Sequence, residues 1–260
     1  MGILEDLFSI RGKVAVVTGG SRGIGLMIAR AYVEAGARVY ISSRKADVCD
    51  AVAKELSASG ECISIPADLS TMEGIERLAG EVSSREQSLH ILVNNAGAAW
   101  GEPMEQFSES GFDKVWLLNV KGVFFLTVRL LDRLRSAATP DDPARVINIG
   151  SIDGIRVPVL QNYPYSAAKA GVHMLTRHMA HHLLNDHINV NAIAPGLFPS
   201  KMTQFLFEQI EDPDDMAMIP TGRAGQPEDM AGIAIYLASR AGAYLTGGVI
   251  PVDGGVSTHG

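Results

Sequence analysis

Several features that direct proteins to secretion, membranes or nucleic acids are missing from this sequence. Cysteine is scarce: Cys49 and Cys62 are the only two among 260 residues and form no CxxC motif, so we expect a reduced, cytoplasmic protein. No apolar run approaches the roughly 18 residues that a membrane-spanning helix needs. The N-terminal MGILEDLFSIRGK has neither the basic nor the apolar region of a signal peptide. The 22 basic residues are outnumbered by 29 acidic ones, which gives a net charge of −7 and does not favour binding to nucleic acid or an anionic membrane.

What the sequence does contain is a regular alternation of short apolar runs and helical stretches. The candidate strands are residues 14–18, 38–42, 62–67, 90–95, 145–150, 189–194 and 248–252. These runs are continuously apolar, as in strands that are covered on both faces, and stretches of crossover length separate them. The pattern predicts a single α/β domain over residues 1–260, with a doubly wound parallel sheet of about seven strands and helices on both faces.

A glycine-rich turn follows the first candidate strand. In TGGSRGIG, Gly19, Gly23 and Gly25 form the pattern GxxxGxG. The common dinucleotide fingerprint GxGxxG fits poorly, because Ile28 would take the place of its third glycine. Glycines can also serve turn geometry alone. Their position between a strand and a helix nevertheless favours a dinucleotide site, with a pyrophosphate at the helix N-terminus.

The end of the second strand indicates which dinucleotide binds. NAD sites usually carry an acid there for the ribose 2′-hydroxyl, but no Asp or Glu occurs between Glu34 and Asp47. Ser43 and Arg44 stand in its place, and Arg22 in the glycine turn adds a second cation. A hydroxyl group and guanidinium groups suit a 2′-phosphate, although both arginines could simply be solvated. The pattern favours NADP(H) over NAD(H).

Several stretches together resemble the classical short-chain dehydrogenase/reductase family. They are TGGSRGIG, NNAG, LNV, IGS, YSAAK, NAIAPG and YLTGGVIPVDGG, in family order, and the resemblance runs from about Lys13 to Gly255. It implies a Rossmann-type fold and a homotetramer, with a dimer as the second choice. The family's subunit contacts would use two long helices, at roughly 111–136 and 165–185.

The resemblance also implies a catalytic tetrad of Asn119, Ser151, Tyr165 and Lys169. Reduction of a ketone needs a proton donor at oxygen, and a phenol with an ordinary pKa of about 10 needs a nearby cation to act near neutrality. Lys169 would supply that charge and hold the nicotinamide ribose. Ser151 would hydrogen-bond the carbonyl oxygen, and Asn119 would hold a water that feeds protons to the lysine.

Two tyrosines in NYPYSAAKAG compete for the role of proton donor. Lys169 lies four residues after Tyr165, one helical turn away on the same face, whereas an alanine has that position relative to Tyr163. Pro164 biases the residue before it toward an extended conformation and suits the first turn of a helix. We therefore expect Tyr163 just outside the helix, in a packing role or in the wall of the substrate pocket.

The resemblance and the turn chemistry together give a set of cofactor-binding residues. They are Gly19, Ser21, Arg22, Gly23, Ile24, Gly25, Ser43, Arg44, Asp68, Leu69, Asn95, Ala96, Gly97, Tyr165, Lys169, Pro195 and Gly196. Asp68 matches the family's adenine contact, and Asn94 begins the segment that matches the neighbourhood of the adenosine ribose. One departure is Pro199, which stands where the family often has a cofactor-contacting threonine, so Ser200 or Thr203 would have to replace it.

The histidines in HMAHHLLNDH raise the question of a metal site. His178 and His182 share a helical face at the spacing of an HExxH helix, but Met179 replaces the glutamate and no third ligand is evident. We therefore expect no metal site.

The segment 197–219 corresponds to the family's substrate lid. It carries an apolar set that either packs the lid down or lines a pocket for an aliphatic or cyclic substrate: Phe198, Met202, Phe205, Leu206, Phe207, Ile210, Met216, Met218 and Ile219. Overall the chain is most similar to NADPH-dependent 3-oxoacyl (β-ketoacyl) reductases, including those associated with rhamnolipid synthesis and lipid metabolism. This implies an oxidoreductase acting on 3-oxoacyl thioesters. The alternatives are a dehydrogenase of sugars, polyols or steroid-like alcohols, and a non-catalytic NADP-binding sensor or scaffold.

Overall fold

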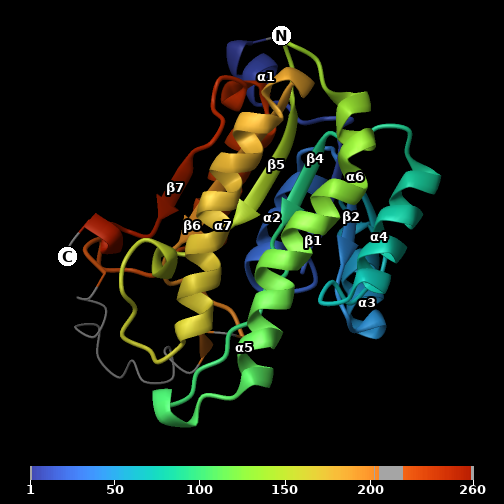
Figure 1. Cartoon of the computed structure of the whole chain (residues 1–260). Helices are drawn as coiled ribbons and strands as arrows, with labels where there is room; N and C mark the ends of the chain where they lie inside the picture. Colours follow the sequence, from blue (N-terminus) through green and yellow to red (C-terminus); the bar gives the residue numbers. More distant parts are fainter. Residues whose placement is uncertain (1, 202, 205–218, 259–260) are drawn as a thin grey trace.

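The centre of the protein is a parallel sheet with the strand order β3-β2-β1-β4-β5-β6-β7 (Figure 1). The structure is a computed structural model and describes residues 2–201, 203–204 and 219–258. The strands are β1 (Val14–Thr18), β2 (Arg38–Ser42), β3 (Glu61–Ser64), β4 (Ile91–Asn94), β5 (Ala144–Ile149), β6 (Ile188–Pro195) and β7 (Val249–Val252). Every neighbouring pair is parallel, which confirms the predicted seven-stranded doubly wound sheet.

Burial on both faces explains why the strands read as continuous apolar runs. All residues of β1, β4, β5 and β6 are buried. The predicted bounds hold within a residue or so except at β3, which ends at Ser64 and not at Ala67. Pro66 has no backbone N–H and so interrupts the regular ladder, although Ala67 N–H still donates to the carbonyl oxygen of Ser43 at 3.1 Å.

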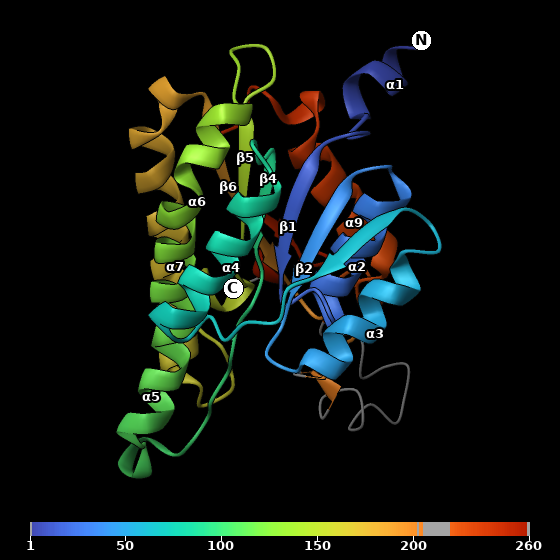
Figure 2. The same cartoon turned by 90° about the vertical axis from the view of Figure 1, so that its right-hand side faces the viewer.

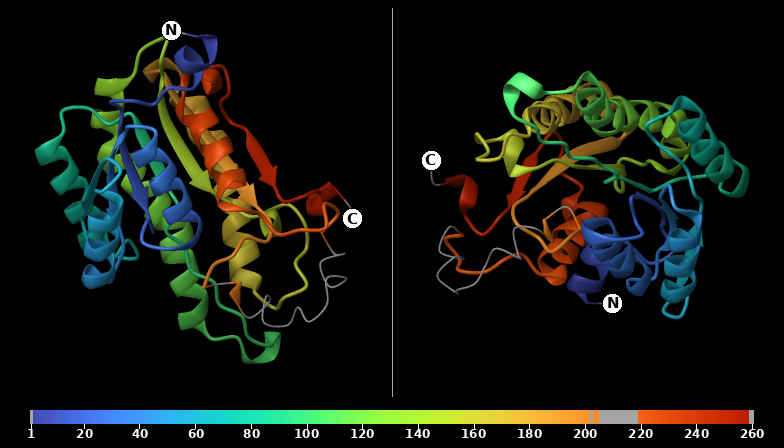
Figure 3. Two further views of the ribbon diagram at one scale, coloured as in Figure 1. Left: turned by 180° about the vertical axis from the view of Figure 1, so that it is seen from behind. Right: turned by 90° about the horizontal axis from the view of Figure 1, so that it is seen from below.

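Helices cover the two faces of the sheet in two groups (Figures 2 and 3). The main helices are α1 (Ile3–Phe8), α2 (Gly23–Glu34), α3 (Ala46–Leu56), α4 (Met72–Arg85), α5 (Glu109–Trp116), α6 (Val123–Ala137), α7 (Tyr163–His182) and α9 (Pro227–Ala238). Helices α2, α3 and α9 contribute to one apolar core, and α4, α6 and α7 contribute to the other. The first core also contains a buried polar link, since the Tyr32 hydroxyl donates to the carbonyl oxygen of Ala234 at 2.9 Å.

Short helical turns connect the larger elements. They are η1 (Met104–Gln106), η3 (Ile152–Gly154), η4 (Leu184–Asp186), η6 (Arg240–Gly242) and η7 (Val256–Thr258). Within the described ranges, none of the helices has the length and apolar character required to traverse a bilayer.

The long helix predicted at 111–136 contains a π-helical segment. Helix α5 continues through η2 (Leu117–Gly122), which is π-helical, into α6. The Ser108 side chain caps the start of α5 by accepting a hydrogen bond from Gly111 N–H at 3.3 Å. Single π turns widen a helix locally and often occur at functional sites. This one carries Asn119, a residue of the predicted tetrad.

The prediction that Tyr163 lies outside the following helix is wrong. Helix α7 begins at Tyr163, with Pro164 in its first turn. The Asn162 carbonyl oxygen accepts the first bonds of the helix, from Tyr165 N–H at 2.8 Å and Ser166 N–H at 3.3 Å. The N–H that proline lacks would have had no intrahelical partner at this position, so the proline does not delay the helix.

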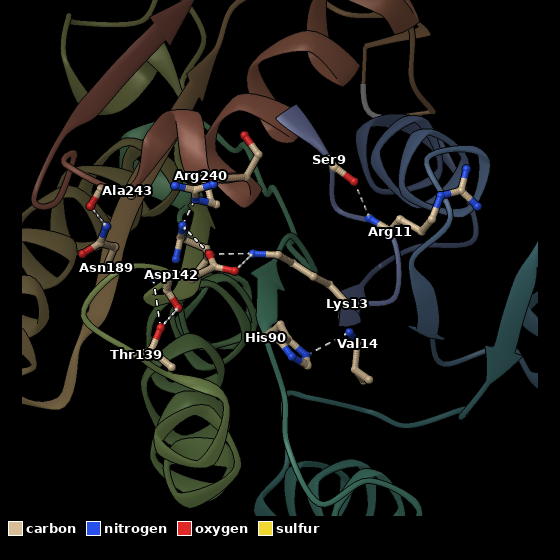
Figure 4. A network of polar contacts seen from close by, with 12 residues as sticks. Ser9, Arg11, Lys13, Val14, His90, Thr139, Asp142, Asn189, Arg240 and Ala243 are labelled. Carbon is tan, nitrogen blue, oxygen red and sulfur yellow. Dashed lines mark hydrogen bonds and ion pairs between the residues drawn. The ribbon is translucent and has the colours of Figure 1, made fainter. Parts of the chain in front are cut away.

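The sheet has two chemically different edges. Because the strands are parallel, the turns that follow β1, β2, β4, β5 and β6 all lie at one edge, and the strand order reverses between β1 and β4. This topological switch point is where doubly wound folds bind ligands. The opposite edge holds an ionic network around Lys13 and Asp142 (Figure 4).

Candidate active site

A cavity of about 480 Å³ opens at the carboxyl edge of the sheet. The predicted cofactor residues that line it are Gly19, Ser21, Arg22, Gly23, Ile24, Ser43, Arg44, Asp68, Leu69, Asn95, Ala96, Gly97, Pro195 and Gly196, and three members of the predicted tetrad join them: Ser151, Tyr165 and Lys169. Gly25 and Asn119 do not line the cavity. The fold therefore brings nearly all of the predicted set to one place.

Backbone geometry explains the glycines of the turn. Gly19 and Gly23 have φ of 65° and 54°, a region that residues with a Cβ rarely adopt. Gly25 lies behind the turn, where a Cβ would collide with the Asn95 side chain and the Gly19 carbonyl. The glycines therefore set the shape of the turn at the N-terminus of α2, where backbone N–H groups can bind an anion.

The Thr18 side chain joins the ends of β1 and β4. Its hydroxyl donates to the carbonyl oxygen of Val93 at 3.2 Å and accepts from the N–H groups of Asn95 and Ala96, both at 2.9 Å. Asn95 returns a bond from Nδ2 to the Thr18 carbonyl oxygen at 2.8 Å. These hydrogen bonds fix the ends of β1 and β4 relative to each other at the switch point, next to the cavity.

Asn94 begins the segment predicted to lie beside the adenosine ribose, but it does not line the cavity. Its side chain is buried in the core, where Nδ2 donates to Thr127 Oγ1 at 3.1 Å and to Asn148 Oδ1 at 2.9 Å. Neighbouring residues in a strand point to opposite faces, so Asn94 faces α6 while the next residue turns to the cavity.

Four cationic side chains besides Lys169 line the cavity. Arg22 and Arg44 line it as predicted, and Lys45 and Lys201 add two cations that the sequence did not reveal. Of the described residues that line the cavity, Asp68 is the only acid. The Ser42 hydroxyl also lies here, buried and without a hydrogen-bond partner among the described residues. A ligand with several negatively charged phosphate groups would suit this lining.

Helix α7 aligns the phenol and the ammonium group of the site. The Lys169 Nζ donates to the carbonyl oxygen of Ile149 at 2.7 Å and lies 5.5 Å from the centroid of the Tyr165 ring. Ser151 lies two residues after β5, and its Oγ accepts from Asp153 N–H at 3.1 Å. The three side chains therefore converge on one part of the cavity from the turn after β5 and from α7.

Burial controls the protonation of this group. Burial raises the pKa of Tyr165 to about 12, a hydrogen bond with Ser151 lowers it, and the charge of Asp153 raises it further. Burial lowers the pKa of Lys169 to about 8. Lys169 is not among the groups that shift the Tyr165 pKa, and its ammonium group is hydrogen-bonded to the Ile149 carbonyl oxygen.

Asn119 lies one layer behind the cavity. It is 1% exposed, and its side-chain amide pairs with the backbone of Ala98: Nδ2 donates to the carbonyl oxygen at 2.9 Å and Oδ1 accepts from N–H at 2.8 Å. A Cβ on Gly97 would lie 3.3 Å from Asn119 Oδ1 and 3.8 Å from Lys169 Nζ. Asn119 is thus close to the lysine, and its water-holding role stays a prediction.

Ser200 and Thr203 both line the cavity, next to the position where Pro199 replaces the usual threonine. The Thr203 hydroxyl donates to the carbonyl oxygen of Phe198 at 2.6 Å. Ser200 lies against the glycine turn, since a Cβ on Gly23 would be 3.2 Å from Ser200 Cβ. Most of the predicted lid, residues 202 and 205–218, lies outside the described residues. At its ends, Phe198 and Ile219 are buried.

The three histidines of the predicted cluster lie close together near the end of α7. The rings of His178 and His182 have centroids 4.8 Å apart, and those of His181 and His182 are 5.1 Å apart. Among the described residues, no three or more His, Cys, Asp or Glu side chains are grouped so that they could hold a metal ion.

Comparison with known proteins shows the family of this chain. The fold and cavity are those of a Rossmann-type α/β protein. The sequence model of the short chain dehydrogenase family matches residues 13–211 of this chain. The chain therefore belongs to this family.

Two relatives and one solved structure are similar to this chain over nearly its whole length. The chain is 53% identical to the rhamnolipids biosynthesis 3-oxoacyl-[acyl-carrier-protein] reductase of Pseudomonas aeruginosa, over 97% of this chain and 99% of that protein. A solved structure described as the Pseudomonas aeruginosa RhlG/NADP active-site complex superposes with a TM-score of 0.94 at 51% identity, over 97% of this chain and 99% of that chain. The chain is also 33% identical to the gluconate 5-dehydrogenase of Gluconobacter oxydans, over 97% of each. The resemblance seen in the sequence is confirmed.

Proposed function

We propose that the protein is an NADPH-dependent ketoreductase that reduces 3-oxoacyl thioesters. The observation that carries this proposal is the single cavity that Ser151, Tyr165 and Lys169 share with the glycine turn and the four other cationic side chains. Family membership supports the reaction class, and the 53% identity to a 3-oxoacyl-[acyl-carrier-protein] reductase supports the substrate class.

The residues of the cavity fit NADP(H). Arg22, Arg44, Lys45 and Lys201 line the cavity and would suit the phosphate groups of the cofactor, and the unpaired Ser42 hydroxyl offers a donor. The glycine turn offers backbone N–H groups for the pyrophosphate, and Asp68, which lines the cavity, would contact the adenine. The bound cofactor would supply the hydride. The close structural match to an RhlG/NADP complex supports the same choice.

The chain's own residues handle the proton and the charge on oxygen. Tyr165, protonated across the physiological range because its pKa is about 12, gives its proton to the carbonyl oxygen. Ser151 donates a hydrogen bond to the same oxygen and stabilises its developing charge. Lys169 is protonated below its pKa of about 8, favours the phenolate left behind and binds the ribose. Asn119 completes the tetrad behind the lysine.

A second candidate is a dehydrogenase of sugar acids or polyols, which the 33% identity to a gluconate 5-dehydrogenase favours. The same proton chemistry would serve it, because only the substrate pocket differs. A non-catalytic NADP-binding sensor would have no need of the buried Tyr165–Lys169 pair, so we place it last.

Assembly and location complete the proposal. Helices α5, α6 and α7 lie side by side in Figure 1 and carry several exposed apolar side chains: Phe112 (43%), Trp116 (40%), Phe124 (38%), Val128 (39%) and Met174 (61%). Exposed apolar surface on neighbouring helices is typical of an interface. We infer a cytoplasmic homotetramer, with a dimer as the alternative, and a substrate lid at about 197–219.

A carbonyl screen tests the proposal. NADPH oxidation would be followed with an acetoacetyl thioester, a cyclic diketone and a set of ketoses, and NADH would serve as the comparison cofactor. The thioester should give the highest kcat/KM. A preference for ketoses would support the second candidate, and no turnover with any carbonyl would contradict both enzymatic functions.

A further inference from the structure

His173 is a buried histidine beside the site, and the proposed proton chemistry does not use it. It lies four residues after Lys169 and eight after Tyr165 on α7, so the three side chains share one face of the helix. His173 is only 5% exposed. A buried histidine is commonly a satisfied packing residue, so its partners decide what it can do.

The partners of the His173 ring are Ser151 and Gly154, at either end of the turn that carries the Ser151 hydroxyl. The backbone N–H of Ser151 donates to His173 Nε2 at 3.4 Å. The ring also donates a hydrogen bond to the backbone carbonyl of Gly154. A neutral imidazole has one acceptor and one donor nitrogen, so with Nε2 as acceptor the donor is Nδ1.

The ring is kept in the neutral form that this pattern requires. Burial lowers the pKa of His173 to about 4, and the charge of Lys169 lowers it as well. Protonation would place a hydrogen on Nε2 and set it against the Ser151 N–H. Because the ring stays neutral across the working range, both bonds persist there.

The turn is also pressed onto the ring. A Cβ at Gly150 would collide with Nε2 of His173, and a Cβ at Gly154 would lie 2.8 Å from Cε1. Within the turn, the Ser151 hydroxyl accepts from Asp153 N–H at 3.1 Å. The position of the Ser151 hydroxyl therefore depends on a turn, residues 150–154, whose ends are fixed to one imidazole ring.

We propose that His173 is a positioning residue for catalysis: its ring clamps the Ser151–Gly154 turn to α7, so that the Ser151 hydroxyl stays in register with Tyr165 and Lys169. This inference rests on the proposed function, because it assigns His173 an effect only through Ser151. The role requires no contact between His173 and the substrate or the cofactor.

Three single variants separate positioning from packing. His173→Leu keeps much of the volume and removes both hydrogen bonds, and His173→Gln keeps an acceptor and a donor. Thr176→Val is the matched control, since Thr176 is also buried on α7 and accepts from Asn148 Nδ2 at 2.9 Å, a residue outside the turn. We expect kcat to fall by about tenfold or more in His173→Leu, with KM and NADPH affinity within about threefold. His173→Gln should recover most of the loss, and Thr176→Val should keep kcat.

A double-mutant cycle with Ser151→Ala gives the decisive readout. If His173 acts through Ser151, His173→Leu should change kcat by less than about twofold once the serine hydroxyl is gone. Should His173→Leu not yield folded protein, His173→Asn, which is too short to span both partners, takes its place. Equal fold-losses in the two backgrounds of an active enzyme would overturn this inference and leave the proposed function standing. A wild-type protein that binds NADPH but reduces no carbonyl would overturn the proposed function, and this inference with it.

Discussion

The ammonium group of Lys169 lies 5.5 Å from the centroid of the Tyr165 ring, one helical turn along α7. The pair is therefore arranged by the helix itself and does not depend on a flexible loop. Burial moves the two groups in opposite directions, with a pKa of about 12 for the phenol and about 8 for the ammonium group. The lysine, and not the tyrosine, is the group that titrates within reach of ordinary assay conditions.

Because Lys169 has a lower pKa than Tyr165, Lys169 should determine how the rate of reduction falls at high pH. Below its pKa of about 8, Lys169 is charged and can stabilise the phenolate that Tyr165 leaves. Above that pH the charge is lost while Tyr165 is still protonated, so kcat/KM should fall with increasing pH from about 8. Lys13→Met should not move this fall, because that buried lysine lies at the opposite edge of the sheet. A profile that stays flat until the phenol itself titrates would contradict the assignment.

Cofactor preference should follow the cationic side chains of the cavity. Ser43→Asp places a carboxylate beside Arg44 and Lys45, where it would repel a 2′-phosphate, so the preference should shift from NADPH toward NADH. Arg44→Ala should weaken NADPH binding and leave NADH binding nearly unchanged. The ratio of kcat/KM for the two cofactors checks both variants. Equal values for the unmodified enzyme would refute the NADP(H) assignment.

The exposed apolar side chains of α5, α6 and α7 predict an oligomer. Phe112 and Trp116 stack with ring centroids 6.3 Å apart on this surface, and a buried charge there would be costly. Trp116→Glu should therefore shift the mass measured by light scattering from tetramer toward smaller species. Glu109→Gln, on the same helix, is the control for charge change alone. A monomeric mass for the wild-type protein at micromolar concentration would rule the interface out.

The ionic network at the far edge of the sheet predicts a loss of stability without a loss of chemistry. Figure 4 shows Lys13 and Asp142 pointing toward each other, and the distances from Lys13 Nζ to the two carboxylate oxygens are 2.7 and 2.8 Å. Asp142 also accepts from Arg145, which is 1% exposed. Asp142→Asn leaves these cations without their partner and should lower the free energy of unfolding by about 2–4 kcal/mol.

Urea denaturation checks this value, and kcat of the folded protein should be unchanged. Asp141→Asn, one residue away, should have little effect on stability. If Asp142→Asn lowers kcat as strongly as it lowers stability, the two edges of the sheet are coupled in a way that the contacts do not explain.

Strand positions were predictable because a strand that is buried on both faces appears in the sequence as a continuous apolar run. Runs such as VAVVT and RVYIS coincide with β1 and β2 residue for residue. The glycine turn and the Tyr165–Lys169 spacing were equally legible, since each depends on local geometry. The end of β3 was harder to predict, because Pro66 interrupts the regular strand hydrogen bonds within an apolar stretch of sequence.

The remaining features depend on contacts that are distant in the sequence. Nothing in the pair Asn94–Asn95 says which side chain faces the core; the pairing of Asn94 with Asn148 decides it. The π-helical turn at Asn119 has no composition signal of its own. Lys45 and Lys201 become part of the site only when the turns after two different strands meet, and His173 is informative only once the Ser151 turn is seen against it.

The most direct test of the proposed mechanism compares the two tyrosines. Tyr165→Phe keeps the ring and removes the proton, and general acid catalysis contributes about 10²–10⁴-fold, so kcat for an acetoacetyl thioester should fall by at least that order while NADPH still binds. Tyr163→Phe is the matched control: Tyr163 begins α7, packs edge-on against Phe107 at 5.9 Å and has no lysine one turn away. Its kcat should stay within several-fold, with any change mainly in KM. Steady-state reduction by both variants, with cofactor binding followed by fluorescence, decides the matter. An inactive Tyr163→Phe beside a fully active Tyr165→Phe would show that the proton donor has been misassigned.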